Sequence, residues 1–199
     1  MATNSIKLLA GNGHPELAKL VSKRPQYRCI TKLVAKMLEV AVDNLYAEPT
    51  AMAWIRNKID LNNAVVVTPD AGGAKRATSI SGKLGLSVAF IHKERPSPGQ
   101  ISRMTLTGTV KGKTAILIDD MADTCGTLCT AAEVLKDHGA NEVLSVVTHG
   151  ILSADAIEKL NKCTALSRCV VTNTVPLLGK EKECEKLEII DISPTLAGL

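Results

Sequence analysis

Hydrophobic and polar positions alternate along residues 64–193 in a way that predicts strands interleaved with helices. Short runs rich in Val, Ile and Leu indicate buried strands, and apolar residues three or four positions apart indicate amphipathic helices. The predicted strands are 64–70, 86–92, 104–110, 113–120, 142–151, 168–175 and 187–193. The predicted helices are 71–85, 126–140 and 153–162, the last capped by Ser153. This order predicts an α/β domain with a mainly parallel sheet.

The first 60 residues carry a different pattern, in which strand-like sequence is scarce. Helical spacing of apolar residues predicts helices over 14–23, 30–46 and 46–59, the last with Pro49 near its start. One short stretch, 5–11, has the pattern of a strand. Three helices and one strand do not make a second α/β domain.

Composition narrows the class of protein. Hydrophobic residues make up 45% of the 199 residues but aromatic residues only 2%, so the core is aliphatic, as in parallel sheets buried on both faces. So few aromatic rings argue against a nucleic-acid binder that stacks bases. The net charge of +4 lies within the first 60 residues without a dense basic run. We therefore expect neither nucleic acid nor a membrane as a partner.

Cysteines and apolar stretches indicate the compartment. No apolar stretch reaches the length of about 18 residues that spans a bilayer, and the N-terminal residues lack the apolar core of a signal peptide. The six cysteines form no CxxC pair, which is typical of free thiols in a reducing compartment. We expect a cytoplasmic protein.

The most informative stretch is AILIDDMADTCGTL, residues 115–128. Its apolar residues predict a buried strand that ends on Asp119 and Asp120, and in open α/β sheets ligands bind beyond the carboxyl ends of strands. Residues 123–127 then open a helix whose free N–H groups favour an anion, while Gly126 lets the backbone come close. Carboxylates accept hydrogen bonds from sugar hydroxyls or hold Mg²⁺. The stretch therefore predicts a sugar-phosphate site; the alternative is a solvated turn with a threonine cap.

Six further stretches extend this motif. They are VDNLYAEP (42–49), VVTPDAGGAKRATSISGKL (66–84), AFIHKER (89–95), THGILSADAI (148–157), VVTNTVP (170–176) and IIDISPTLA (189–197). Together with IDDMADTCGT they resemble the ribose-phosphate pyrophosphokinase family, also called phosphoribosyl pyrophosphate synthetases. The resemblance follows family order from residue 42 onward. It implies a phosphoribosyltransferase type I fold, which is a Rossmann-like, mainly parallel sheet with helices on both faces.

The resemblance also implies a reaction and a set of site residues. The family transfers pyrophosphate from MgATP to the C1 hydroxyl of ribose 5-phosphate, giving phosphoribosyl pyrophosphate and AMP for nucleotide biosynthesis. By motif, Asp119 and Asp120 would hold the ribose hydroxyls and Asp70 would bind Mg²⁺. Lys93 and Arg95 would contact the ATP phosphates and stabilise charge during transfer. The 5-phosphate would be bound by Asp123, Thr124, Cys125, Gly126 and Thr127.

Each of these assignments has a plainer interpretation. Lys93 and Arg95 could be ordinary charges of the polar stretch 93–103, whose two prolines predict a loop. Asp70 could cap the helix that follows it. His149, at the end of a predicted strand, is interpreted as a structural residue rather than a ligand.

The resemblance is weakest over the first 60 residues. The opening resembles the family's first strand and helix, and residues 31–41 resemble a helix from much later in the family's first domain. The family's intervening segment, with a metal-binding histidine, has no counterpart. We expect residues 1–60 to be a mostly helical remnant of the N-terminal domain and 61–199 the C-terminal phosphoribosyltransferase-like domain. By this comparison the sugar-phosphate half of the family's site looks intact and the ATP half looks deleted. The resemblance also implies assembly as a homo-oligomer or with full-length family members.

Three alternative functions differ from this one in the sequence features that they require. A non-catalytic subunit associated with the same enzyme is the main alternative, although such members usually degrade the acidic loop that is intact here. A phosphoribosyltransferase would share that loop but not VDNLYAEP or TPDAGGAKR. A nicotinamide-binding Rossmann domain is disfavoured because no GxGxxG follows a strand.

Overall fold

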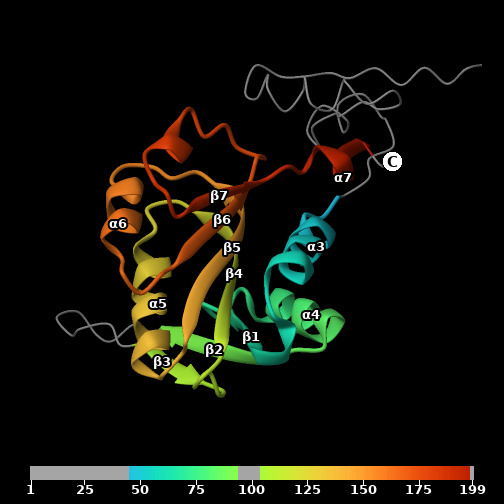
Figure 1. Ribbon diagram of the computed structural model, residues 1–199, viewed down its shortest axis with the longest axis vertical. Helices are drawn as coiled ribbons and strands as arrows, with labels where there is room; N and C mark the ends of the chain where they lie inside the picture. Colours follow the sequence, from blue (N-terminus) through green and yellow to red (C-terminus); the bar gives the residue numbers. More distant parts are fainter. Residues whose placement is uncertain (1–44, 94–103, 198–199) are drawn as a thin grey trace, which may run out of the picture.

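The chain folds into a sheet covered by helices on both faces (Figure 1). The structure is a computed structural model that describes residues 45–93 and 104–197. Its strands are β1 (Ala64–Thr68), β2 (Ser87–Lys93), β3 (Met104–Thr107), β4 (Thr114–Ala122), β5 (Glu142–Gly150), β6 (Arg168–Thr172) and β7 (Leu187–Ile190). Its α-helices are α3 (Glu48–Lys58), α4 (Ala74–Leu84), α5 (Gly126–Asp137), α6 (Ala156–Lys162) and α7 (Ser193–Ala197). Two short 3₁₀ helices cover Leu61–Asn63 and Lys180–Lys182.

The described strands form one seven-stranded sheet in the order β3-β2-β1-β4-β5-β6-β7. Every neighbouring pair is parallel except β2 and β3, which are antiparallel. The predicted α/β fold with a mainly parallel sheet is therefore confirmed. The chain runs from β1 outward to β2 and then returns to β4 on the other side of β1. This reversal is the topological switch point, where open α/β sheets bind their ligands.

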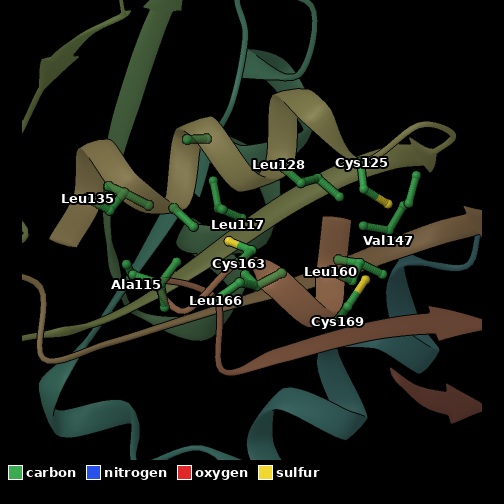
Figure 2. Close-up of a cluster of buried hydrophobic side chains, with 14 of the residues drawn as sticks. Ala115, Leu117, Cys125, Leu128, Leu135, Val147, Leu160, Cys163, Leu166 and Cys169 are labelled. Atoms are coloured by element: carbon green, nitrogen blue, oxygen red, sulfur yellow. The ribbon is translucent and has the colours of Figure 1, made fainter. Parts of the chain in front are cut away.

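Each face of the sheet packs against its own pair of helices, with α3 and α4 on one side and α5 and α6 on the other (Figure 1). The central strand β1 is buried along its whole length, which explains its unbroken run of apolar residues. Aliphatic side chains and buried thiols fill the space between the sheet and the helices α5 and α6 (Figure 2). The five cysteines of the described residues are free, as predicted.

Local sequence explains where the helices start and stop. The helix α4 begins after Gly73 and ends at Gly85, whose φ of 71° is the left-handed conformation that glycine adopts without strain. The helix α3 has a proline in its first turn, as predicted. The helix α5 stops at Asp137, inside the predicted range 126–140, and Gly139, with φ of 84°, follows its end.

One predicted cap is wrong. The N-cap residue of α6 is Asp155, and Ser153 lies before the helix. The N–H of Ser153 donates to the carbonyl of Asp123 (3.1 Å), and its hydroxyl donates to the carboxylate of the same residue. Leu152 and Ala154 take left-handed backbone conformations (φ 51° and 49°) that turn this segment toward the end of β4. The serine therefore stabilises a neighbouring loop instead of a helix.

The predicted division after residue 60 stays a prediction. The helix α3 contributes Met52 and Ile55 to the same apolar cluster as Ile80 and Ile116, so it packs into the core of the sheet. The elements predicted for 5–11, 14–23 and 30–46 lie wholly or almost wholly outside the described residues, as does most of the predicted 93–103 loop. Within the described ranges, no helix has the length and apolar character needed to cross a membrane.

Candidate functional site

Polar side chains gather at the carboxyl ends of β1 and β4, the two strands that flank the switch point. Asp70 follows β1, and Asp119 and Asp120 lie in the C-terminal half of β4. The two strands are hydrogen-bonded neighbours, with Val67 paired to Leu117. The charge of Asp70 acts on the pKa of Asp119, so the candidate metal ligand and a candidate sugar ligand share one environment.

The neighbouring carboxylates of Asp119 and Asp120 share an arginine partner. Arg76, in the first turns of α4, places Nη1 3.8 Å from Oδ1 of Asp119 and Nη2 3.2 Å from Oδ2 of Asp120. The N–H of Asp120 also donates to Oδ1 of Asp119 over 2.8 Å. The Asp119 side chain is 15% exposed and that of Asp120 is 56% exposed. The strand continues two residues beyond its predicted end, to Ala122, and the contact with Arg76 offsets the repulsion between two like charges near its carboxyl end.

The environment separates the pKa values of the two carboxylic acids. Burial raises the pKa of Asp119 to about 6, and the charges of Asp120 and Asp70 act in the same direction, against the lowering effect of the Asp120 N–H. For Asp120, partial burial acts to raise the pKa. The hydrogen bond with Asp119 and the Arg76 guanidinium outweigh it, so the pKa of Asp120 lies below its usual value. The two acids therefore titrate in different pH ranges, and Asp120 loses its proton at the lower pH.

The loop after β4 presents backbone donors at the start of α5. Cys125 is the N-cap residue, with a left-handed backbone (φ 58°) and no side-chain cap. The first N–H groups of α5 therefore point out of the helix without an acceptor within it. Thr124 and Thr127 are exposed on either side of Gly126. The arrangement can receive an anion such as a phosphate.

The side chain of Cys125 belongs to the core. It is 4% exposed, and burial raises the pKa of its thiol to about 12. Figure 2 shows Cys125 and Val147 among the apolar side chains beneath α5. Only the backbone of Cys125 is therefore available to a ligand on the loop.

The turn after β1 is held by Asp70. Its Oδ1 accepts from the N–H of Gly73 over 2.9 Å, and its carbonyl accepts from the hydroxyl of Thr68 over 2.9 Å. The capping interpretation of Asp70 is wrong, because the N-cap residue of α4 is Gly73, which has no side-chain cap, and the Asp70 carboxylate accepts from the N–H of that residue within the preceding turn. A β-carbon on Gly73 would collide with the Thr68 hydroxyl, so the glycine lets the turn pass close to the end of β1.

The predicted ATP-contacting residues lie at the edge of the described chain. Lys93 ends β2 and pairs with Met104 of the antiparallel strand β3. Its side chain, and Arg95 entirely, lie outside the described residues. His149 is placed at the end of β5 as predicted, where its Nδ1 lies 2.8 Å from the Thr174 hydroxyl.

A cleft of about 430 Å³ opens beside Asp119. It is bounded by α3, α4 and the carboxyl ends of β4, β5 and β6, and Asp119, Gly72 and Arg76 line it. Sequence reasoning did not single out Arg76. The available signal was its position four residues before the buried Ile80, which places it beside the core-facing side of α4.

Comparisons with known proteins agree with this geometry. The family described as "Phosphoribosyl synthetase-associated domain" matches residues 96–198. "Ribose-phosphate pyrophosphokinase 2" of Schizosaccharomyces pombe is 56% identical over 160 residues, which are 79% of this chain and 50% of that protein. "Ribose-phosphate pyrophosphokinase 2" of Saccharomyces cerevisiae is 54% identical over 158 residues, or 79% of this chain and 48% of that protein.

A solved structure gives the same result. The crystal structure of phosphoribosylpyrophosphate synthetase from Mycobacterium smegmatis superposes with a TM-score of 0.71 at 35% sequence identity, covering 84% of this chain and 54% of that one. The chain thus spans about half the length of the curated relatives it matches. From the family match, the curated relatives and the shared fold, the chain belongs to the ribose-phosphate pyrophosphokinase, or phosphoribosyl pyrophosphate synthetase, family.

Proposed function

We propose that the chain is a ribose-phosphate diphosphokinase. It would transfer pyrophosphate from MgATP to the C1 hydroxyl of ribose 5-phosphate, yielding 5-phosphoribosyl 1-pyrophosphate and AMP for nucleotide biosynthesis. The single observation that supports this most directly is the order of groups from the last residues of β4 to the start of α5. Two carboxylates, Asp119 and Asp120, are followed within seven residues by the uncapped N-terminus of α5. Carboxylate oxygens that can accept hydrogen bonds from hydroxyl groups thus lie close to N–H groups that can donate to a phosphate. The two sets of groups match the two ends of a sugar phosphate.

The sugar phosphate would be held at both ends by fixed groups. Asp119 and Asp120 would accept hydrogen bonds from the ribose hydroxyls, because each carboxylate has two oxygens that can accept. Backbone donors of residues 123–127 and the hydroxyls of Thr124 and Thr127 would hold the 5-phosphate. Because pyrophosphoryl transfer is governed mostly by positioning and charge neutralisation, orienting the C1 hydroxyl is the main contribution of this half of the site.

Asp70 is the candidate Mg²⁺ ligand. The described residues contain no cluster of three or more His, Cys, Asp or Glu side chains that could hold a metal on its own. Magnesium bound with a nucleotide needs only one or two carboxylates, because phosphate oxygens and waters complete its octahedron. The exposed Asp70 beside Asp119 fits that requirement. When bound there, the ion would offset the negative charge of the phosphate oxygens.

Lys93 and Arg95 are proposed to contact the ATP phosphates. Lys93 is the last residue of β2, two strands from β4 in the sheet. Cations that follow this strand could stabilise the charge that develops during transfer. We also propose cytoplasmic localisation and assembly as a homo-oligomer or with full-length family members.

The deciding experiment measures AMP release from MgATP by the purified 199-residue chain, with and without ribose 5-phosphate. The test variant is the double change Asp119→Asn/Asp120→Asn, which removes both charges and preserves the shape. The matched control is Asp137→Asn, which removes one exposed carboxylate at the opposite end of α5.

Three outcomes are informative. Release that depends on ribose 5-phosphate, persists in the control and is lost in the double variant supports the proposal. Release that survives in the double variant refutes the role of the two carboxylates. A folded chain that binds ribose 5-phosphate without releasing AMP would instead support the associated-subunit function, which stimulation or inhibition of a full-length family member would then test.

A further inference from the structure

We propose that Arg76 is a positioning residue that makes the sugar site selective for a vicinal diol, a preference for ribose over deoxyribose. This inference rests on the proposed function, because it assumes that Asp119 and Asp120 accept the sugar hydroxyls. The observation behind it is one guanidinium that contacts both carboxylates, 3.8 Å from Oδ1 of Asp119 and 3.2 Å from Oδ2 of Asp120.

Strand geometry alone would separate the two carboxylates. Successive side chains of a β-strand point to opposite faces of the sheet, and Asp119 and Asp120 are adjacent residues of β4. Their exposures of 15% and 56% reflect this difference. Two like charges would also repel each other. A contact with one cation therefore draws together two groups that the backbone and their charges would drive apart.

The guanidinium has a shape suited to this task. It is planar and presents several N–H donors in a fixed fork, whereas a lysine ammonium is a single point of charge. Arg76 donates a hydrogen bond from Nη2 to Oδ2 of Asp120, while its Nη1 lies at ion-pair distance, 3.8 Å, from Oδ1 of Asp119. Each carboxylate has two oxygens that accept hydrogen bonds, so each retains an acceptor for a sugar hydroxyl. Two acceptors held side by side match two neighbouring hydroxyls.

Within the described ranges, no other cation forms a salt bridge with either carboxylate. Lys75 is adjacent to Arg76 on α4 and also lines the cleft, but its position on the helix is rotated by about 100°. The contact links residues 44 positions apart in the chain. Arg76 thus ties the start of α4 to the end of β4 across the switch point.

The test is isothermal titration calorimetry of the 199-residue chain at about pH 8, where both carboxylates are ionised. Three probes are titrated: ribose 5-phosphate, 2-deoxyribose 5-phosphate and inorganic phosphate. The variants are Arg76→Ala and Arg76→Lys. The control is Arg56→Ala, which removes an exposed arginine of α3 whose hydrogen bond goes to the carbonyl of Lys83 at the other end of α4.

The wild-type chain is expected to bind ribose 5-phosphate more tightly than the deoxy sugar. Arg76→Ala should lose about tenfold in ribose 5-phosphate affinity, the scale of one charged hydrogen bond. The deoxy sugar should lose less, so that the ratio of the two affinities falls toward one. Arg76→Lys should show the same fall, because charge without the fork cannot bridge both carboxylates. Affinity for inorganic phosphate should change in neither variant.

The ratio is measured on one sample, so a partly folded variant does not distort it. An unchanged ratio in Arg76→Ala, or a full ratio in Arg76→Lys, would overturn the inference and leave the sugar-phosphate site standing. An equal loss for inorganic phosphate would also overturn it, since Arg76 would then act on the phosphate loop. Failure of the wild-type chain to bind ribose 5-phosphate would refute the proposed function, and this inference with it.

Discussion

Asp119→Asn is expected to stabilise the chain above about pH 6 while it weakens the sugar site. The ionised carboxylate of Asp119 is disfavoured in the folded chain, because burial raises its pKa from 3.8 to about 6. Asparagine has nearly the same shape, keeps an oxygen that can accept from the Asp120 N–H, and carries no charge. The change therefore removes an electrostatic penalty and leaves the packing of β4 intact.

The shift gives the size and the pH range of the effect. A rise of about two pKa units corresponds to about 3 kcal/mol between the two protonation states, and the lost contact with Arg76 reduces the gain, so we expect about 1–3 kcal/mol. Below about pH 4 the acid is protonated in both the folded and the unfolded chain. As the pH rises from about 4 to 6, the unfolded chain loses its proton first and the wild-type stability falls. The advantage of Asp119→Asn should grow across this window and then stay constant.

Urea denaturation in metal-free buffer at about pH 5 and pH 8, with thermal melts beside it, measures this difference. The expected rise in Tm at about pH 8 is roughly 3–10 °C for a chain of this size. The matched control is Asp120→Asn, which should lower stability, because the contacts of Asp120 hold its pKa below the usual value. Equal or lower stability of Asp119→Asn at the higher pH, or an identical gain at both, would refute the electrostatic reasoning.

Four further substitutions test the supports of the site and core. Ser153→Ala removes the hydroxyl that donates to Asp123; it should lower the unfolding free energy by about 1 kcal/mol and weaken inorganic phosphate binding in calorimetry. Gly73→Ala should lower Tm, because the new β-carbon would collide with the hydroxyl of the threonine that ends β1. By contrast, the β-carbon of Gly82→Ala would meet nothing within 4 Å, and this change should raise the unfolding free energy by about 0.5–1 kcal/mol. Leu135→Ala empties a fully buried position in α5 and should cost about 2–5 kcal/mol in urea denaturation; a loss below about 1 kcal/mol would contradict its place in the core.

The fold was predictable because its signals are local and strong. Apolar runs such as 64–68 and 115–118 could be read as buried strands, and Gly85 marked the end of a helix whose apolar face is correctly spaced. The strand predicted for 104–110 ends earlier, at Thr107. Gly108, with φ of 114°, turns the chain there and lies against Ala89. The alternation of apolar and polar residues predicts a strand, but it does not show that Gly108 approaches Ala89 closely and ends the strand there.

The site was only partly predictable, because its supports come from distant parts of the chain. The carboxylates and the phosphate loop form one continuous motif, so the sequence placed them together. Arg76 is 44 residues away from its Asp120 partner, and the helical pattern that predicts α4 does not indicate what faces its first turn. Ser153 looked like a helix cap. The left-handed backbone at Leu152 and Ala154 directs Ser153 toward Asp123. Leucine and alanine rarely adopt this conformation, so the sequence gives no sign of it.

The strand that carries the carboxylates also explains why the fold tolerates them. Residues 115–118 of β4 are buried, and the strand is hydrogen-bonded on both sides, to β1 and to β5. The packing and hydrogen bonds of this part of the sheet keep Asp119 in place, although the desolvation that raises its pKa disfavours its charged form. The next residue, Asp120, is exposed to solvent and contacts Arg76. The same guanidinium lies near the carboxylate of Asp119, which is thereby held in a fixed position as a hydrogen-bond acceptor. The stability of the core therefore maintains an arrangement that the acidic residues would not adopt by themselves, which is why Asp119→Asn should gain stability and lose binding together.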